Sequence, residues 1–382
     1  MLNKIILSVV VISSFCACNY NKKSQKSGDL LGEDKSAKID SLVMRYHKLN
    51  RFSGTVLVAF KGELQYQKHF GLANYENKIP ITSTTAFKVG EITELVTLNI
   101  LKKLVDENKL EMSDSLSQFV QKVGIKASIG DLVNEKVDVS YNLIGELIEK
   151  VSKADYQKNI EDYAKSLGLE HTFFNDEDAV IATGYLYDNI DGKGLKLRKS
   201  SSYNLNDAFS STGLKSTGSD LAKIVHAQTK NINIHGYLKN DGFSYALVHD
   251  AEKQLSIIIL SNRKHPVANE IVIGVNAIIN NKEYKMPLLR QPFKIDKSIL
   301  PNFIGSYSLN PNMNFEVTLV NDRLFVTMGT NKIHLIPQAP NQFYITFSDA
   351  SMRFITDSTG KVNSIKLLNG FIDSDQVAKR LP

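Results

Sequence analysis

The chain has 382 residues, of which 42% are hydrophobic and 23% charged; this composition argues against a disordered protein and allows two domains. Its net charge of +6 comes from basic residues interspersed with acids, and we find no nucleic-acid-binding motif, so we expect no nucleic-acid partner. The histidines are scattered, without the spacing of a metal site, so we expect no metal and no cofactor.

The N-terminal segment 1–17 predicts an export signal. It contains Lys4, a mostly apolar run over residues 5–12 and small residues near its end, which is typical of a secretory signal peptide rather than a spanning helix. Both cysteines of the chain lie near the N-terminus, Cys16 inside this segment and Cys18 just after it, so no disulfide framework supports the body of the protein.

The stretch around Cys18 resembles a bacterial lipoprotein processing site, at which Cys18 would become the acylated first residue. The alternative is cleavage nearby, which would release a soluble periplasmic protein. Residues 18–35 are polar and rich in Lys, Ser and Gly, which predicts a flexible tether. We therefore expect an exported lipoprotein, held to a membrane by its N-terminal lipid and facing the periplasm or the cell surface.

The first domain is predicted to span residues 36–285. Apolar residues recur at helical spacing over 36–49, and two β-rich runs then flank a turn at Lys61-Gly62. Helical patterns dominate from Glu91 to Gly168, where glycine is a plausible C-terminal stop. A second hairpin turns at residues 250–253, so the sequence favours an antiparallel sheet made of the first and last hairpins, with helices inserted between them.

The second domain is predicted to span residues 286–382. Its segments alternate apolar with polar residues and turn at Asn321-Asp322 and at residues 358–360. This pattern is typical of a small, separate all-β module.

Several segments follow one known family in order. They are "FSGTVLVAFKGELQYQKHFG", "YNLIGELIEKVS", "STGLKSTGSDLAKI" and "GFSYALVHDAEKQLSIIILSN". Together they resemble the serine β-lactamase and penicillin-binding-protein superfamily, in its class C β-lactamase-like branch of esterases and D-Ala-D-Ala peptidases. The resemblance covers roughly residues 36–265 and implies an α+β fold. That fold is an antiparallel sheet flanked by helices with a helical insertion, followed here by a barrel-like β domain of the kind often appended to such proteins.

The resemblance also places a Ser-x-x-Lys pair at the start of the helix in "FKVGEITELVTLNILKKL", where one helical turn would bring the hydroxyl and the amine to one face. The matching residues here are Glu91 and Glu94. A carboxylate is a weak nucleophile whose acyl product would be an anhydride, so Glu91 cannot replace the serine. Negative charge at a helix N-terminus is favoured by roughly 0.3–1 kcal/mol, which accounts for the survival of acids there.

The other two family motifs are also altered. The Tyr-x-Asn positions fall on Lys136 and Asp138, and the strand that faces the nucleophile retains only His235-Gly236. No catalytic motif is therefore intact. A cluster containing Glu91, Glu94 and Asp138 would also repel the carboxylate that substrates of the family carry.

Three hypotheses follow for function. The first is a catalytically inactive envelope lipoprotein that binds or scaffolds, with an envelope protein or a cell-wall-derived ligand as its partner. The second is a repurposed enzyme in which Glu91 or Glu94 acts as a general acid or base. The third keeps residual esterase- or peptidase-like activity through Ser210, Ser211 or Thr212, which we instead expect to form a turn before a helix at Asp220.

Overall fold

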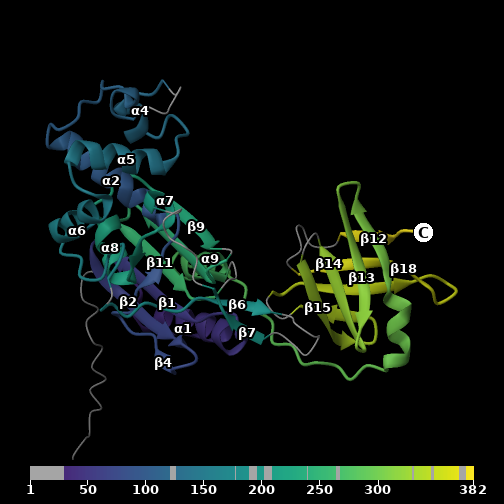
Figure 1. Ribbon diagram of the computed structural model, residues 1–382. Helices are drawn as coiled ribbons and strands as arrows, with labels where there is room; N and C mark the ends of the chain where they lie inside the picture. Colours follow the sequence, from purple (N-terminus) through teal and green to yellow (C-terminus); the bar gives the residue numbers. More distant parts are fainter. Residues whose placement is uncertain are drawn as a thin grey trace, which may run out of the picture.

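The computed structural model describes residues 30–382 apart from 121–125, 177, 189–195, 202–208, 239, 264–266, 329–330, 346–347 and 370–375. Figure 1 shows a body of helices packed on a sheet and, beside it, a separate barrel. Segment 280–296, which contains no helix or strand, joins the two. The predicted domain boundary at 285–286 falls inside this segment. No helix among the described residues is long and apolar enough to cross a membrane.

The body is built on a five-stranded antiparallel sheet in the order β2-β1-β11-β10-β9. Its outer strands are β2 (Glu63–Phe70) and β9 (Ile232–Leu238), and β10 spans Phe243–Asp250. In the centre β1 (Gly54–Phe60) pairs with β11 (Leu255–Ser261). The two predicted hairpins therefore lie side by side in one sheet, as expected.

Both faces of the sheet are covered by helices, so its central strands are buried on both sides. Helices α1 (Gly32–Lys48) and α9 (Val267–Ile279) cover one face, where Val56 and Ile257 enter their core. The other face receives Leu57 and Ile258, whose neighbours come from the inserted helices. Alternate residues of one strand therefore belong to two cores, which is the period-2 pattern of a pleated strand.

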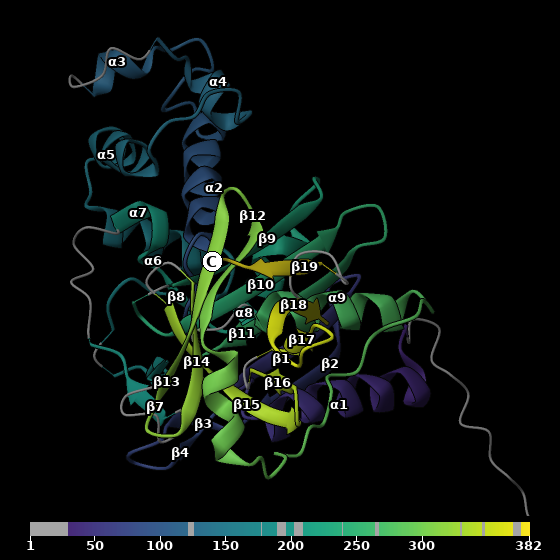
Figure 2. The ribbon, with the colours of Figure 1, turned by 90° about the vertical axis from the view of Figure 1, so that its right-hand side faces the viewer.

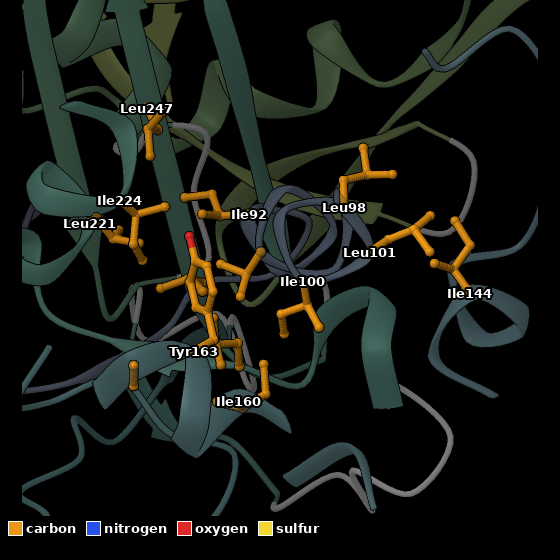
Figure 3. Close-up of a cluster of buried hydrophobic side chains, with 14 of the residues drawn as sticks. Ile92, Leu98, Ile100, Leu101, Ile144, Ile160, Tyr163, Leu221, Ile224 and Leu247 are labelled. Carbon is orange, nitrogen blue, oxygen red and sulfur yellow. The ribbon is translucent and has the colours of Figure 1, made fainter. Parts of the chain in front are cut away.

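The insertion between β2 and β9 is mostly helical. Figure 3 shows Leu101 of α2 and Ile144 of α5 directed towards each other within its core. Its helices are α2 (Ile92–Asp106), α3 (Leu116–Phe119), α4 (Ile129–Val133), α5 (Tyr141–Ser152), α6 (Tyr156–Ser166), α7 (Phe209–Thr212) and α8 (Gly218–His226). Short strands accompany them: β3 (Leu72–Asn74), β4 (Ile79–Pro80), β5 (Phe87–Lys88), β6 (Tyr185–Asp188), β7 (Lys196–Lys199) and β8 (Lys215–Ser216), of which β8 pairs with β5.

The C-terminal module is a closed eight-stranded barrel preceded by the 3-10 helix η3 (Lys297–Phe303). Its strands are β12 (Gly305–Asn310), β13 (Met313–Val320), β14 (Arg323–Met328), β15 (Asn331–Ala339), β16 (Gln342–Tyr344), β17 (Ser351–Thr356), β18 (Val362–Leu368) and β19 (Val377–Arg380). Aromatic rings fill its interior, where those of Phe303 and Phe354 lie 4.6 Å apart. The α+β architecture with an appended barrel is thus confirmed.

An ion pair joins the body to the barrel. Arg51, whose side chain is only 4% exposed, donates to Asp349 at 3.0 Å, and the same carboxylate oxygen accepts the backbone N–H of Leu288 at 3.1 Å. Arg290 donates to the carbonyl oxygen of Ala350 at 3.0 Å. The barrel is therefore fixed both by the linker and directly by the body.

Three sequence predictions need correction. Helix α1 begins at Gly32, so residues 32–35 of the predicted tether are helical; Leu31 is already buried, which apolar spacing counted from Ile39 does not reveal. Ser210–Thr212 form the short helix α7 rather than a turn. Strands β12 and β19 were not predicted, because their polar residues hide the period-2 alternation.

Candidate functional site

The site begins at the N-terminus of α2, where Glu91 is the residue before the first helical turn and Glu94 lies within that turn. Gly90 precedes them with φ +55°, a left-handed conformation that favours glycine. A Cβ at Gly90 would lie 2.3 Å from the ring of Tyr245, so packing requires glycine there as well. The conformation and packing of Gly90 therefore fix the position of the backbone from which Glu91 and Glu94 project.

A cavity of about 400 Å³ opens beside this helix end. Helix α2, the loops before α5 and β9, and β9 itself form its walls. The lining residues are Glu91, Glu94, Leu95, Leu98, Lys102, Glu135, Tyr141, Gln228, Lys230, Asn231, Ile232, Asn233, Ile234 and His235. None of these described lining residues is a serine, threonine or cysteine, so the wall offers no hydroxyl or thiol nucleophile of the usual kind.

Carboxylates dominate the electrostatics of the cavity near α2. Burial, with the charge of Glu91 as a second cause, raises the pKa of Glu94 to about 7. Burial also raises the pKa of Tyr141 to about 12, helped by the charge of Glu94. Further along the helix, burial lowers the pKa of Lys102, and nearby Lys230 lowers it more. Glu94 therefore exchanges its proton near neutral pH, which is unusual for a carboxyl group.

Tyr245 closes the gap between α2 and the edge strand β9. Its hydroxyl accepts the backbone N–H of Glu91 at 3.2 Å, and burial raises its pKa to about 12. A Cβ at Gly236 would lie 2.7 Å from that hydroxyl oxygen. Tyr245 is thus held between Gly90 and Gly236, and the N–H at position 91 is already used in a hydrogen bond.

The structure brings most of the residues singled out in the sequence into one region. Glu91, Glu94 and His235 line the same cavity. Lys136 and Asp138 line a second cavity of about 280 Å³, which shares Leu98, Glu135 and Tyr141 with the first. The predicted lipid anchor, Cys18, lies outside the described residues.

The hydroxyl group of Ser210 serves the fold. The residue is fully buried, and its hydroxyl donates to the carbonyl oxygen of Tyr141 at 2.7 Å. Its carbonyl oxygen accepts a hydrogen bond from Thr97 at 2.7 Å. These contacts tie α7 to α2 and α5 beneath the cavity.

Sequence reasoning missed Lys102, Glu135, Tyr141, Lys230 and Tyr245. Tyr141 is the first residue of α5, in a segment already aligned with the family, and Tyr245 lies on the second hairpin. Both residues were therefore within aligned segments, but no motif marked them as part of the site. The lysines and Glu135 come from segments whose approach depends on tertiary packing. Among the described residues no group of three His, Cys, Asp or Glu side chains could hold a metal ion.

The comparisons relate the chain to penicillin-recognising hydrolases. The sequence is 25% identical to a teichoic acid D-alanine hydrolase of Staphylococcus aureus, over 50% of this chain and 57% of that protein. The chain therefore spans little more than half the length of these curated relatives. No protein-family model matches.

Solved structures agree on the fold. The crystal structure of FmtA from Staphylococcus aureus aligns with a TM-score of 0.53 at 17% identity, covering 68% of this chain and 93% of that one. An octameric penicillin-binding protein homologue from Pyrococcus abyssi aligns with a TM-score of 0.53 at 18% identity, covering 90% of this chain and 99% of that one. A β-lactamase/D-alanine carboxypeptidase from Pseudomonas syringae aligns with a TM-score of 0.54 at 15% identity, covering 66% of this chain and 100% of that one.

Proposed function

We propose that this chain, a homologue of β-lactamase and penicillin-binding-protein-like hydrolases, is a cell-envelope lipoprotein that binds a ligand or partner without forming an acyl-enzyme. The observation that carries the proposal is the composition of the cavity wall. Glu91 and Glu94, which match the family's serine and lysine in the sequence resemblance, line it, and none of its described lining residues is a serine, threonine or cysteine.

The hydrogen bond of Tyr245 supports the same proposal. Acyl transfer needs N–H groups that are free to donate to the oxyanion developing in the transition state. The N–H of Glu91, at the head of α2, instead donates to the Tyr245 hydroxyl. A carbonyl entering this end of the cavity would first have to displace that tyrosine.

The charge of the cavity defines the class of ligand. At the α2 end of the cavity Glu91 and Glu94 favour a cation over the carboxylate that β-lactams carry, whereas Glu135 on the opposite wall already lies 3.8 Å from Lys230. The curated relatives are named for hydrolysing D-alanine from teichoic acid. A D-alanyl ester has a free ammonium group and no free carboxylate, so a cell-wall-derived group of this chemistry suits the cavity.

Intact-protein mass tests the loss of acyl transfer. The protein is incubated with a fluorophosphonate and, separately, with a penicillin, beside a Glu91→Ser, Glu94→Lys variant. We expect no adduct on the wild-type protein. A stoichiometric adduct mapped to one serine would overturn the proposal and identify the nucleophile.

Calorimetric titration tests the ligand class. We expect D-alanine methyl ester, a cation, to bind more tightly than N-acetyl-D-alanine, an anion. The preference should grow between about pH 6 and 7.5, because Glu94 then becomes charged while the α-amino group of the ester, with an ordinary pKa of about 7.7–8.0, still keeps its proton. The Glu94→Gln variant should lose that pH dependence, whereas Glu63→Gln, on the exposed end of β2, should keep it.

A second candidate function is acid or base catalysis by Glu94. A carboxyl group with a pKa of about 7 holds and releases a proton at the pH where it would act. Turnover of the D-alanyl ester with a pH profile that Glu94→Gln abolishes, and without any covalent adduct, would favour this candidate over simple binding.

A further inference from the structure

The linker between the body and the barrel carries an exposed surface that is both basic and apolar. Lys282, Lys285 and Lys294 are exposed, as are Leu288 (42%), Leu289 (62%) and Phe293 (40%). We define these six residues as the linker surface. Figures 1 and 2 show the segment running along the outside of the molecule from α9 to the barrel.

Contacts on the inner side of the linker keep these side chains outside. Tyr284 and Met286 pack against the core beneath α1 and α9. Arg290 turns inward to the carbonyl oxygen of Ala350, and the backbone N–H of Phe293 donates to the carbonyl oxygen of Pro337 at 2.8 Å. The segment is therefore held in place while Leu289 and its neighbours face solvent.

The charge of the linker surface is unbalanced. Its three lysines have no ion-pair partner within 4.0 Å among the described residues. Segment 280–296 has four basic residues, these lysines and Arg290, against two acids, Glu283 and Asp296. Exposed leucine and phenylalanine between lysines is the composition of segments that lie at a membrane interface, where the apolar groups enter the headgroup region and the cations meet anionic lipid. Charge therefore favours an anionic lipid surface over a neutral one.

The place where the N-terminal segment joins the body supports the same partner. Lys35, in the first turns of α1, donates to the carbonyl oxygen of Ile279 at 2.7 Å, and the linker begins immediately after Ile279. Eleven residues lie between Cys18 and Leu30, so twelve residue-to-residue steps join them. Fully extended, they reach about 40 Å, so an anchor at Cys18 would keep the start of the linker near the membrane.

We propose that the linker surface is a second, non-covalent membrane contact that lies down on anionic lipid and orients the body and the barrel relative to the bilayer. The lipid anchor expected at Cys18 would supply attachment. The lysines and the apolar side chains would then supply orientation. This proposal is independent of what the cavity binds.

The chain offers a direct probe, because it contains no tryptophan. From residue 18 onward Cys18 is its one cysteine, so the chain can be coupled to vesicles through a maleimide lipid. In Leu289→Trp the probe lies on the linker surface, at a residue that is 62% exposed. The matched control is Tyr237→Trp, at a residue of β9 that is 50% exposed; β9 lies far from the linker in Figures 1 and 2.

On vesicles containing phosphatidylglycerol we expect blue-shifted emission and quenching by brominated lipid for Leu289→Trp, and neither for Tyr237→Trp. On vesicles of pure phosphatidylcholine both tryptophans should show the emission of a solvent-exposed side chain and no quenching by brominated lipid. A Leu289→Trp probe that stays in water on anionic vesicles, or two probes quenched alike, would overturn the proposal and leave a protein partner as the occupant.

A charge variant tests the electrostatic part without an added probe. Partition of the uncoupled chain onto the same vesicles should fall about fivefold for each neutralised lysine, and of order a hundredfold for Lys282→Gln, Lys285→Gln and Lys294→Gln together. The control neutralises three other exposed lysines, Lys109, Lys158 and Lys253. Equal losses for both triple variants would contradict a localised surface. Protection of residues 281–294 from hydrogen exchange on vesicles checks the wild-type chain.

Discussion

Replacing Glu94 by glutamine should stabilise the protein at alkaline pH and leave it unchanged at acidic pH. Burial raises the pKa of Glu94 from 4.5 to about 7. Each unit corresponds to about 1.4 kcal/mol, so holding this carboxyl group charged costs the folded state up to about 3 kcal/mol. Glu94 is only partly buried, and screening by solvent lowers the expected cost to about 1–2 kcal/mol.

The sign follows from which state holds the proton. Below pH 4.5 the carboxyl group is protonated in both states, so it contributes no pH dependence. Between pH 4.5 and 7 the unfolded chain has released its proton while the folded chain keeps it, so the wild-type protein loses stability as the pH rises through this window. Above pH 7 both states are charged, and the full cost remains.

Urea unfolding of the wild type and Glu94→Gln, followed by tyrosine fluorescence at pH 4.5, 6, 7 and 8, measures the difference. We expect the variant to be more stable by about 1–2 kcal/mol at pH 8 and equal at pH 4.5. Glu63→Gln, at the exposed start of β2, provides the control. A difference between wild type and Glu94→Gln that stays constant across this range would refute the assignment of a raised pKa.

Two further predictions concern Tyr245 and the domain interface. Adding Tyr245→Phe to the Glu91→Ser, Glu94→Lys variant frees the N–H at position 91, so fluorophosphonate labelling measured by mass should become about a hundredfold faster than in the double variant; an unchanged rate would show that this N–H does not limit acylation. Replacing Asp349 by alanine removes one carboxylate from buried Arg51, whose charge still interacts with Glu270, so we expect a loss of about 1–3 kcal/mol in urea unfolding and exposure of the linker to limited proteolysis. Should the variant resist protease as the wild type does, the linker alone holds the barrel.

Local pattern predicted the fold well where periodicity and turns were strong. The turn at Lys61-Gly62 and the stop at Gly168 are both confirmed, and both glycines have positive φ. Pairing of β1 with β11 also followed, because two apolar hairpins need a common sheet to bury both their faces. The closing strands of the barrel escaped prediction, since ladder hydrogen bonds rather than apolar alternation define them.

The site was predictable only as far as the family motifs reached. Glu91, Glu94 and His235 were placed by collinear segments, and they line one cavity. Tyr245 could not be foreseen in its role, because that role depends on two glycines more than 100 residues apart approaching one ring. Nor does the sequence reveal that burial raises the pKa of Glu94 to about 7, because that burial depends on how the cavity walls pack around the side chain.

The pairing of β1 with β11 also has a consequence for when the protein folds. These strands join residues roughly 200 positions apart, so the sheet gains its central ladder only after a long loop has closed. Chains dominated by such distant contacts fold slowly. The export signal predicted for residues 1–17 would leave the ribosome well before the far strand is made. Late closure of the sheet would keep the chain unfolded long enough for it to be translocated across a membrane and to fold on the other side.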